Sequence, residues 1–244
     1  AAVDTEATYV VSRTNFENIR EVLQTQKRTA ADGILMDLGV SSHQLDEGER
    51  GFSYHQDAAL DMRMDRRDEL TAREIVNRWP HASLARILRE YGEEKHASRI
   101  ADEIVRIRAL TPIMTTGVLS GVIEKAAGWR MPQKSKARIF QALRIYVNRE
   151  LEELQEGLDG ALEILKIGGR LCVISYHSLE DRIVKNFMRD RANPCICPHD
   201  LPVCRCGRKP ELRILTRKPV AASPEELAIN ERSRSAFLRA AEKR

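Results

Sequence analysis

Apolar positions along the chain follow two different periods, and the changes between them divide the sequence into three regions. In the first, residues 1 to about 65, short apolar runs at Thr8–Val11 and Gly33–Met36 flank a helical pattern. Parallel strands that are covered on both faces have continuous apolar runs of this kind. Short runs that alternate with helices therefore predict an α/β sheet.

The second region, about 70 to 135, is highly charged and has the helical period. Apolar residues at steps of three and four form one helical face at Leu84–Tyr91 and another at Ile100–Ile107. We expect an inserted helical domain over residues 67–136. The flanking residues, 1–66 and 137–244, then form one sheet domain from two separate stretches of chain.

The third region predicts a long helix from Val147 to Leu165 that stops at Gly168-Gly169. A strand, Leu171–Ser175, follows at once, and its end leads through a polar loop into another helix. Two late apolar runs, near Leu212–Thr216 and Ser235–Ala240, predict a terminal hairpin. This order is typical of the second half of a nucleotide-binding type of α/β sheet.

Composition excludes some classes of protein without choosing one. The chain has no apolar run of the length that crosses a bilayer, and its first residues lack the basic-then-apolar layout of a secretion signal. Four of its five cysteines lie within residues 195–206. This distribution suits a metal site in a reducing compartment better than a disulfide framework. We expect a cytoplasmic protein without a membrane partner.

Polar residues follow both predicted central strands. Asp37 follows the first strand, and Tyr176–Asp181 follows the strand at Leu171–Ser175. Ligands in open α/β sheets bind beyond the carboxyl ends of the strands. The segment Asp37–Asp46 suits an adenosine-like or amine-bearing ligand; the alternative is a capped turn in which Asp37 or Ser41 holds backbone amides.

The segment from Arg50 to Asp65 mixes aromatic, acidic and basic residues without a regular period. Phe52 or Tyr54 could stack on a nucleobase, and Asp61 or Asp65 could accept a hydrogen bond from an exocyclic amine. The alternative is a salt-bridged loop that only fixes the helical domain.

His177, Ser178 and Asp181 contain the residue types of a hydrolase triad, but partners in such a relay usually come from separate elements. The sequence also lacks a Gly-x-Ser-x-Gly elbow. Capping of the following helix is the alternative role for these residues.

Cysteines occur as two Cys-x-Cys pairs, Cys195 with Cys197 and Cys204 with Cys206. Four thiolates can complete a tetrahedral zinc shell, which leaves no open position for catalysis. We predict a structural zinc ion, with four reduced thiols or two disulfides as the alternatives.

Basic residues gather in three places, and the two C-terminal groups contain almost no acids. Such groups are typical of phosphate contacts with nucleic acid, although basic solvated faces are common. The groups are Lys134, Lys136, Arg138 and Arg144; Arg205, Arg208, Lys209, Arg213, Arg217 and Lys218; and Arg232, Arg234 and Arg239.

Nearly the whole chain resembles the bacterial family of 16S ribosomal RNA cytosine-N4 methyltransferases known as RsmH or MraW. Several of the matching blocks are specific to that family. They are Asp32–Ser42, Gln44–Asp46, Glu49–Tyr54, Leu60–Asp65, Tyr91–Glu94, Phe140–Ile145, Val147–Asn148, Glu150–Leu151, Gly168–Arg170, Ser175–Lys185, Thr216–Pro219 and Arg232–Ala236.

The resemblance implies a Rossmann-like class I methyltransferase sheet, incomplete at its N-terminus, with the helical domain inserted for RNA recognition. It implies that S-adenosylmethionine donates a methyl group to the exocyclic amine of one cytidine in small-subunit (16S) ribosomal RNA. Contacts with that cofactor are implied for Phe16, Asp37 and Gln44. Members of the family also carry a strand, a glycine-rich loop and an acidic strand end, which together occupy roughly the 70 to 80 residues ahead of this start. We therefore expect this 244-residue chain to bind the cofactor weakly or not at all.

An amine whose lone pair is delocalised needs a hydrogen-bond acceptor that polarises it and a group that takes up its proton. We expect Asp61, Asp65 or His177 to serve as that acceptor. RNA contacts are predicted for Phe52, Tyr54, Arg63, Arg144 and Arg182. The alternative function is a non-catalytic ribosomal RNA-binding assembly factor, and a homodimer is left open.

Overall fold

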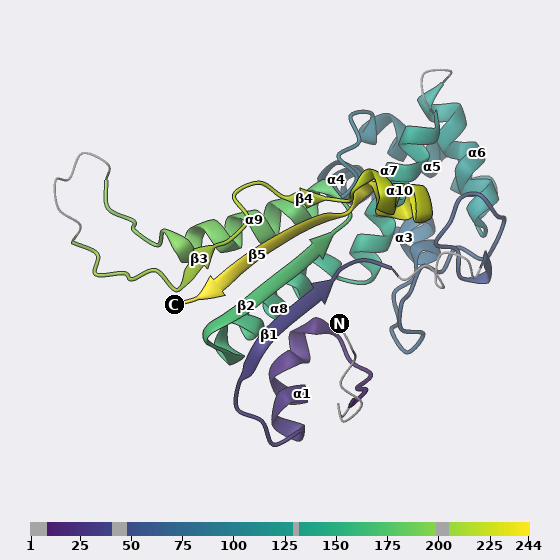
Figure 1. The fold of residues 1–244 in the computed structure, drawn as a ribbon. Coiled ribbons are helices and arrows are strands. Elements are labelled where there is room, and N and C mark those ends of the chain that lie inside the picture. Colours follow the sequence, from purple (N-terminus) through teal and green to yellow (C-terminus); the bar gives the residue numbers. More distant parts are fainter. Residues whose placement is uncertain (1–8, 41–47, 129–131, 199–204) are drawn as a thin grey trace. The chain divides into compact units, whose positions relative to one another are not determined.

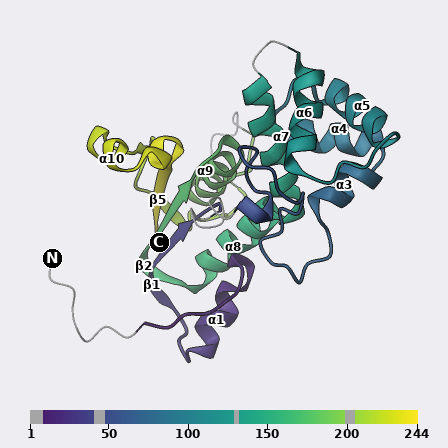
Figure 2. The same ribbon diagram turned by 90° about the vertical axis from the view of Figure 1, so that its right-hand side faces the viewer.

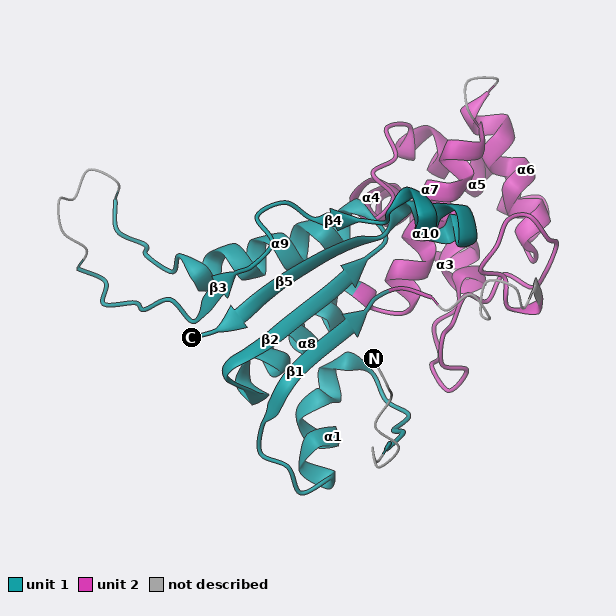
Figure 3. Cartoon of the chain, in the orientation of Figure 1, with its two compact units in different colours: residues 1–38, 151–244 teal, residues 39–150 magenta. Residues whose placement is uncertain are grey.

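The computed structural model describes residues 9–40, 48–128, 132–198 and 205–244. The chain divides into two compact units, which Figure 3 shows in different colours. A sheet unit consists of residues 1–38 and 151–244, and a helical unit consists of residues 39–150. The predicted α/β class with an inserted helical part is confirmed.

The sheet unit contains strands in the order β1-β2-β5-β3, with β4 paired to β5 (Figure 1). β1 and β2 are parallel, whereas β5 runs antiparallel to β2, β3 and β4. The two predicted late strands therefore do pair with each other. The strands are β1 (Ala31–Asp37), β2 (Leu165–Ser175), β3 (Leu212–Ile214), β4 (Val220–Ala221) and β5 (Phe237–Lys243).

Two helices, α8 (Glu150–Ile164) and α9 (Ser178–Ala192), cover one face of this sheet (Figure 2). Their apolar side chains share one core with Met36 of β1 and with Leu171 of β2, which are fully buried. The opposite face carries Leu35, which is 65% exposed. The remaining short helices of the unit are η1 (Phe16–Asn18), α1 (Ile19–Thr25), α10 (Pro224–Ile229) and η3 (Glu231–Ser235).

The helical unit is built around a core of its own, to which its helices contribute their apolar faces. Thr71 and Thr115 cap two of these helices by accepting a hydrogen bond from the backbone three residues on. The elements are η2 (Gly48–Arg50), α3 (Ala72–Arg78), α4 (His81–Glu90), α5 (Ala97–Arg108), α6 (Thr116–Ala127) and α7 (Pro132–Val147). Within the described residues, no helix is long and apolar enough to cross a bilayer.

This unit extends beyond the limits of 67–136 that the periodicity predicts. Leu60, Met62 and Phe140 lie outside those limits, yet they are buried in the helical core. The segment 50–65 has no regular period, so its core residues could not be recognised from spacing.

The predicted helix from Val147 to Leu165 is wrong in two respects. It is divided at Arg149, whose φ of 49° lies in the left-handed region, so α7 and α8 are separate helices. It also ends at Ile164, because Leu165 already belongs to β2, and Gly168-Gly169 lies within that strand. The predicted apolar run at Thr8–Val11 forms no strand over its described residues.

Candidate functional site

The carboxyl ends of β1 and β2 lie side by side, and each end carries a polar side chain. Asp37 pairs in register with Ile174, and the backbone N–H of Leu38 continues the pairing by donating to the Ile174 carbonyl. The phenol of Tyr176, just beyond β2, donates to Asp37 Oδ1 at 2.9 Å. An exposed carboxylate is thus fixed where open α/β sheets bind ligands.

Tyr176 keeps its proton in this position. Burial raises the pKa of Tyr176 to about 12, and the hydrogen bond to Asp37 acts in the same direction. The phenol therefore remains a donor at neutral pH, and Asp37 keeps one oxygen for another donor.

Phe16 lies next to this strand end. A Cβ atom added to Gly157 in α8 would be 2.8 Å from Phe16 Cβ and 3.1 Å from Met36 Cε, so all three residues meet at one point. Asn15 Nδ2 also donates to Glu153 Oε1 at 2.7 Å, which holds the preceding residue against α8. Phe16 is therefore next to Met36, the residue before Asp37, while the Asp37 side chain points to the other face of β1. Gln44 lies outside the described residues.

His177 is the N-cap of α9. Its Nδ1 accepts from the backbone N–H of Glu180 at 3.4 Å, and Glu180 Oε2 accepts from the N–H groups of Tyr176 and His177. The imidazole is buried: Nε2 lies 3.2 Å from Glu180 Oε1, and no hydrogen bond reaches it from the described residues. Asp181 accepts two hydrogen bonds from Arg239. The capping role weighed for this loop is therefore present.

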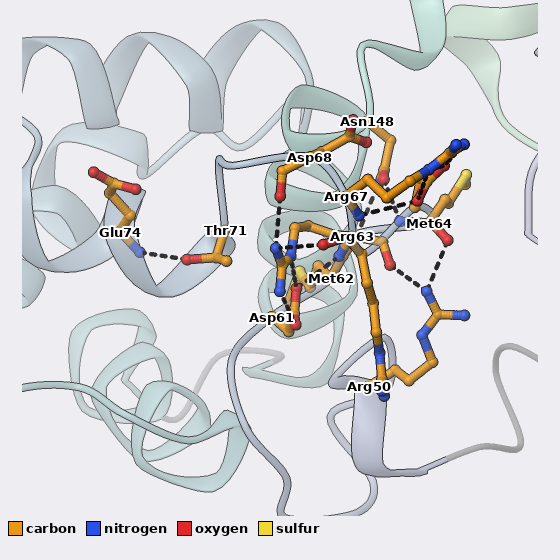
Figure 4. Close-up of polar contacts among 12 residues, drawn as sticks. Arg50, Asp61, Met62, Arg63, Met64, Arg67, Asp68, Thr71, Glu74 and Asn148 are labelled. Atoms are coloured by element: carbon orange, nitrogen blue, oxygen red, sulfur yellow. Dashed lines mark hydrogen bonds and ion pairs between the residues drawn. The ribbon is translucent and has the colours of Figure 1, made fainter.

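A network of arginines and carboxylates fills the segment after η2 in the helical unit (Figure 4). Arg63 donates to both oxygens of Asp61, at 2.6 and 2.9 Å, and its remaining nitrogen donates to the carbonyls of Arg66 and Asp68. The Arg63 guanidinium lowers the pKa of Asp61. Asp61 is thus a fixed, charged acceptor and a weak base.

Asn148 ties this network to the end of α7. Its side chain donates to the Met62 carbonyl at 2.8 Å and accepts from the Met64 N–H, and Arg50 donates to the carbonyls of Arg63 and Met64 (Figure 4). The salt-bridged loop that the sequence left as an alternative is therefore formed.

The other predicted residues of this segment differ in how they are presented. Asp65 accepts from Arg67 at 2.9 Å and is only partly covered. The Phe52 ring is 7% exposed and lies under the Arg50 guanidinium, so it offers no free face to a base. Tyr54 is half-buried, with its ring edge-on to Phe140, and it is the aromatic of the pair that solvent reaches.

Three of the four basic residues predicted as a group in the helical unit are paired with acids. Arg144 donates to both oxygens of Glu150, at 2.8 and 2.9 Å, and the two side chains are 15% and 9% exposed. Lys136 pairs with Glu124, and Arg138 lies 3.7 Å from the buried Glu94. The predicted RNA contact Arg144 and its neighbours thus serve the fold of this unit.

A groove of about 520 Å³ in the sheet unit presents a different kind of basic surface. Its lining residues come mainly from α9, β3 and β5, and no acidic residue of the described chain is among them. Its basic residues are Lys185, Arg189, Arg213, Arg217, Arg239 and Arg244. Within the described part of the chain, Lys185, Arg217 and Arg244 have no carboxylate at ion-pair distance. Arg182, predicted to contact RNA, is exposed on the same helix.

Three of the predicted metal ligands, Cys195, Cys197 and Cys206, come together after α9. Cys204 lies outside the described residues.

The sequence did not predict the role of Gly157 or the hydrogen bond from Tyr176 to Asp37. The hydrogen bond could have been anticipated, because Tyr176 follows β2 directly and Asp37 ends the neighbouring strand β1.

Comparison with known proteins places the chain in a family. The model of the MraW methylase family matches residues 2–244. The chain belongs to this family. The predicted family resemblance is therefore confirmed.

Curated relatives in the family have one name, ribosomal RNA small subunit methyltransferase H. The protein from Symbiobacterium thermophilum is 57% identical over 231 residues, which cover 93% of this chain and 73% of the relative. That from Carboxydothermus hydrogenoformans is 51% identical over 96% of this chain and 76% of its own length. That from Clostridioides difficile is 51% identical over 94% and 75%, respectively.

Proposed function

We propose that this protein uses S-adenosylmethionine to methylate the N4 exocyclic amine of one cytidine in 16S ribosomal RNA, and we still expect residues 1–244 by themselves to bind the cofactor weakly or not at all. The observation that carries the proposal is the family match over residues 2–244, together with relatives named for the small-subunit ribosomal RNA. The geometry of each unit then suggests how its residues take part.

The strand-end site of the sheet unit fits S-adenosylmethionine. The cofactor carries hydroxyl, amino and ammonium donors and a flat purine, which suit a carboxylate with a spare acceptor position and an aromatic ring. Asp37 and Phe16 are these groups, and Tyr176 keeps the carboxylate in place. When bound, the cofactor supplies an electrophilic methyl group.

The amine of cytosine needs a fixed acceptor, because its lone pair is delocalised into the ring. We assign this role to Asp61 and Asp65, whose arginine partners keep them charged and oriented. Tyr54 is the aromatic that we assign to stacking on the base. His177 is assigned a positioning role, because its capping bonds hold the backbone that carries Tyr176.

Phosphate contacts are proposed for the basic groove of the sheet unit. RNA brings a regular array of negative charges, and cations without a carboxylate partner bind phosphate without first breaking an ion pair. Lys185, Arg217 and Arg244 meet this condition in the groove. Arg182 is proposed to extend the surface along α9.

The test is methyl transfer by protein expressed from the full gene, with immature small ribosomal subunits and labelled S-adenosylmethionine. Nucleoside mass spectrometry should identify N4-methylcytidine and distinguish it from the C5 isomer.

Asp37→Asn should lower methyl transfer through a higher KM for the cofactor. Asp32→Asn is the control, because it changes another exposed carboxylate on the same strand. A protein that binds the subunits but transfers no methyl group would instead be the non-catalytic assembly factor.

A further inference from the structure

Three cysteine side chains converge in the segment between α9 and β3. The Sγ atoms of Cys195, Cys197 and Cys206 all lie within 4.8 Å of one another, and those of Cys195 and Cys206 are 3.9 Å apart. None of these positions belongs to the strand-end site or to the basic groove.

The spacing of the sulfurs is too long for a disulfide and fits either a thiol–thiol hydrogen bond or a shared metal ion. Zinc binds thiolate sulfur at about 2.3 Å, so two sulfurs of a tetrahedral site are about 3.8 Å apart. A disulfide would bring them to about 2.05 Å. The 3.9 Å between Cys195 and Cys206 agrees with the edge of a tetrahedral metal site and is nearly twice a disulfide length.

The backbone around the sulfurs supplies a hydrogen-bond donor. The N–H of Arg205 donates to Cys197 Sγ at 3.3 Å. Arg205, Arg208 and Lys209 make the chain next to Cys206 basic. Gly207, with φ of 67°, takes the left-handed conformation that the turn after Cys206 requires.

Apolar packing does not account for the order of this segment. Ile196, the large apolar residue between the first two cysteines, is 65% exposed, and Cys195 is exposed as well. Chain segments without a core are commonly held by a metal, whose binding free energy then stabilises the fold.

We propose that Cys195, Cys197 and Cys206 are ligands of a structural zinc ion. The ion replaces the thiol protons, which are released to the solvent, and joins the end of α9 to the chain that enters β3. This site is independent of the proposed methyl transfer. It orders Arg208, Lys209 and Glu211, which line a cavity of about 720 Å³ with Asp159 and Arg191.

Metal analysis of the whole protein tests the site. Protein purified without chelator should hold about one zinc per chain. Cys195→Ser and Cys206→Ser should each lower zinc retention at least about tenfold, whereas Cys172→Ser, in β2, should leave it unchanged. Zinc contents that do not differ among these variants and the wild type would overturn the proposal, as would wild-type protein that binds no zinc.

A second measurement covers variants that fail to fold. Cobalt exchanged into the wild type should give the thiolate charge-transfer and tetrahedral absorption bands. Removal of zinc by a chelator should leave the helix content unchanged while protease cleavage within residues 193–211 increases. Octahedral cobalt spectra, or cleavage that chelation does not alter, would contradict the site.

Discussion

Both units pair many of their arginines with carboxylates, but the sheet unit also has a group of cations without such a partner among the described residues. In the helical unit, Arg63 and Arg144 each donate to both oxygens of a carboxylate. In the sheet unit, Lys185, Arg217 and Arg244 line a groove that no acid enters. The number of cations in a stretch of sequence therefore says little about nucleic-acid binding. The presence of an acidic partner in the fold separates a structural arginine from one that can bind phosphate.

The largest expected effect is on the stability of the helical unit. Arg63→Ala would leave Asp61 without its cation and two carbonyls without a donor. Because the paired side chains are only 20% and 26% exposed, we expect a loss of about 3 kcal/mol in the free energy of unfolding. Urea denaturation followed by circular dichroism measures it.

Arg67→Ala is the matched control for this change. Arg67 pairs with Asp65 in the same segment, but its side chain is 79% exposed, so we expect a loss below about 0.5 kcal/mol. Equal losses in the two variants would show that exposure does not separate the two ion pairs.

The next effect concerns RNA affinity. Replacing Lys185, Arg217 and Arg244 by alanine together should weaken RNA binding about 10- to 100-fold and lower the slope of log K against log salt by about 2. Fluorescence anisotropy across a salt series measures both. Arg78→Ala, which removes a cation paired with Glu74, is the control and should change affinity less than about twofold. An unchanged salt slope in the triple variant would remove the groove from the RNA interface.

A smaller effect contrasts two helical glycines, one from each unit. Gly121→Ala in α6 meets no atom within 4 Å and should stabilise the protein by about 0.8 to 1 kcal/mol. Gly157→Ala in α8 would press on Phe16, so the same helix preference should be outweighed, with a net loss of about 1 kcal/mol. Thermal unfolding measures both. Equal stabilisation of the two would mean that Phe16 is not held against α8.

The smallest expected effect is on the free energy of unfolding at alkaline pH. Since the pKa of Tyr176 is raised to about 12, the folded protein keeps this proton between pH 10 and 12 while the unfolded chain releases it. The folded state therefore binds more protons over that range, and its stability falls as pH rises. Tyr176→Phe should flatten this fall in denaturation experiments at pH 9 and 11. An identical pH dependence in the variant would exclude the phenol of Tyr176 as its cause.

The elements with a clear period could be predicted from the sequence. The strand at Leu171–Ser175 and the helical faces at Leu84–Tyr91 and Ile100–Ile107 all form. The position of Asp37 at the end of a strand is also predictable, because a polar residue after an apolar run indicates a strand end. Gly168-Gly169 led to the wrong prediction of a helix end, since glycine permits both a helix stop and an extended strand.

Long-range pairing explains what the sequence did not reveal. Asn148 fixes the loop at Met62 and Met64, which lie more than 80 positions earlier in the sequence. Periodicity cannot predict such a contact, because it depends on a single side-chain amide. Gly157 is likewise informative only once Phe16 is seen against it. For the same reason, the ion pairs of Lys136, Arg138 and Arg144 could not be told from solvated cations.

The connectivity of the units affects the order in which they can fold. The helical unit is one continuous stretch whose core needs no residue from outside it, whereas β1 must pair with a strand made much later: Lys166 binds Asp32 across 134 positions. Closing so long a loop carries a large entropy penalty unless the intervening chain is already compact. We therefore expect the helical unit to fold before β1 and β2 pair, which would shorten the loop that this pairing must close.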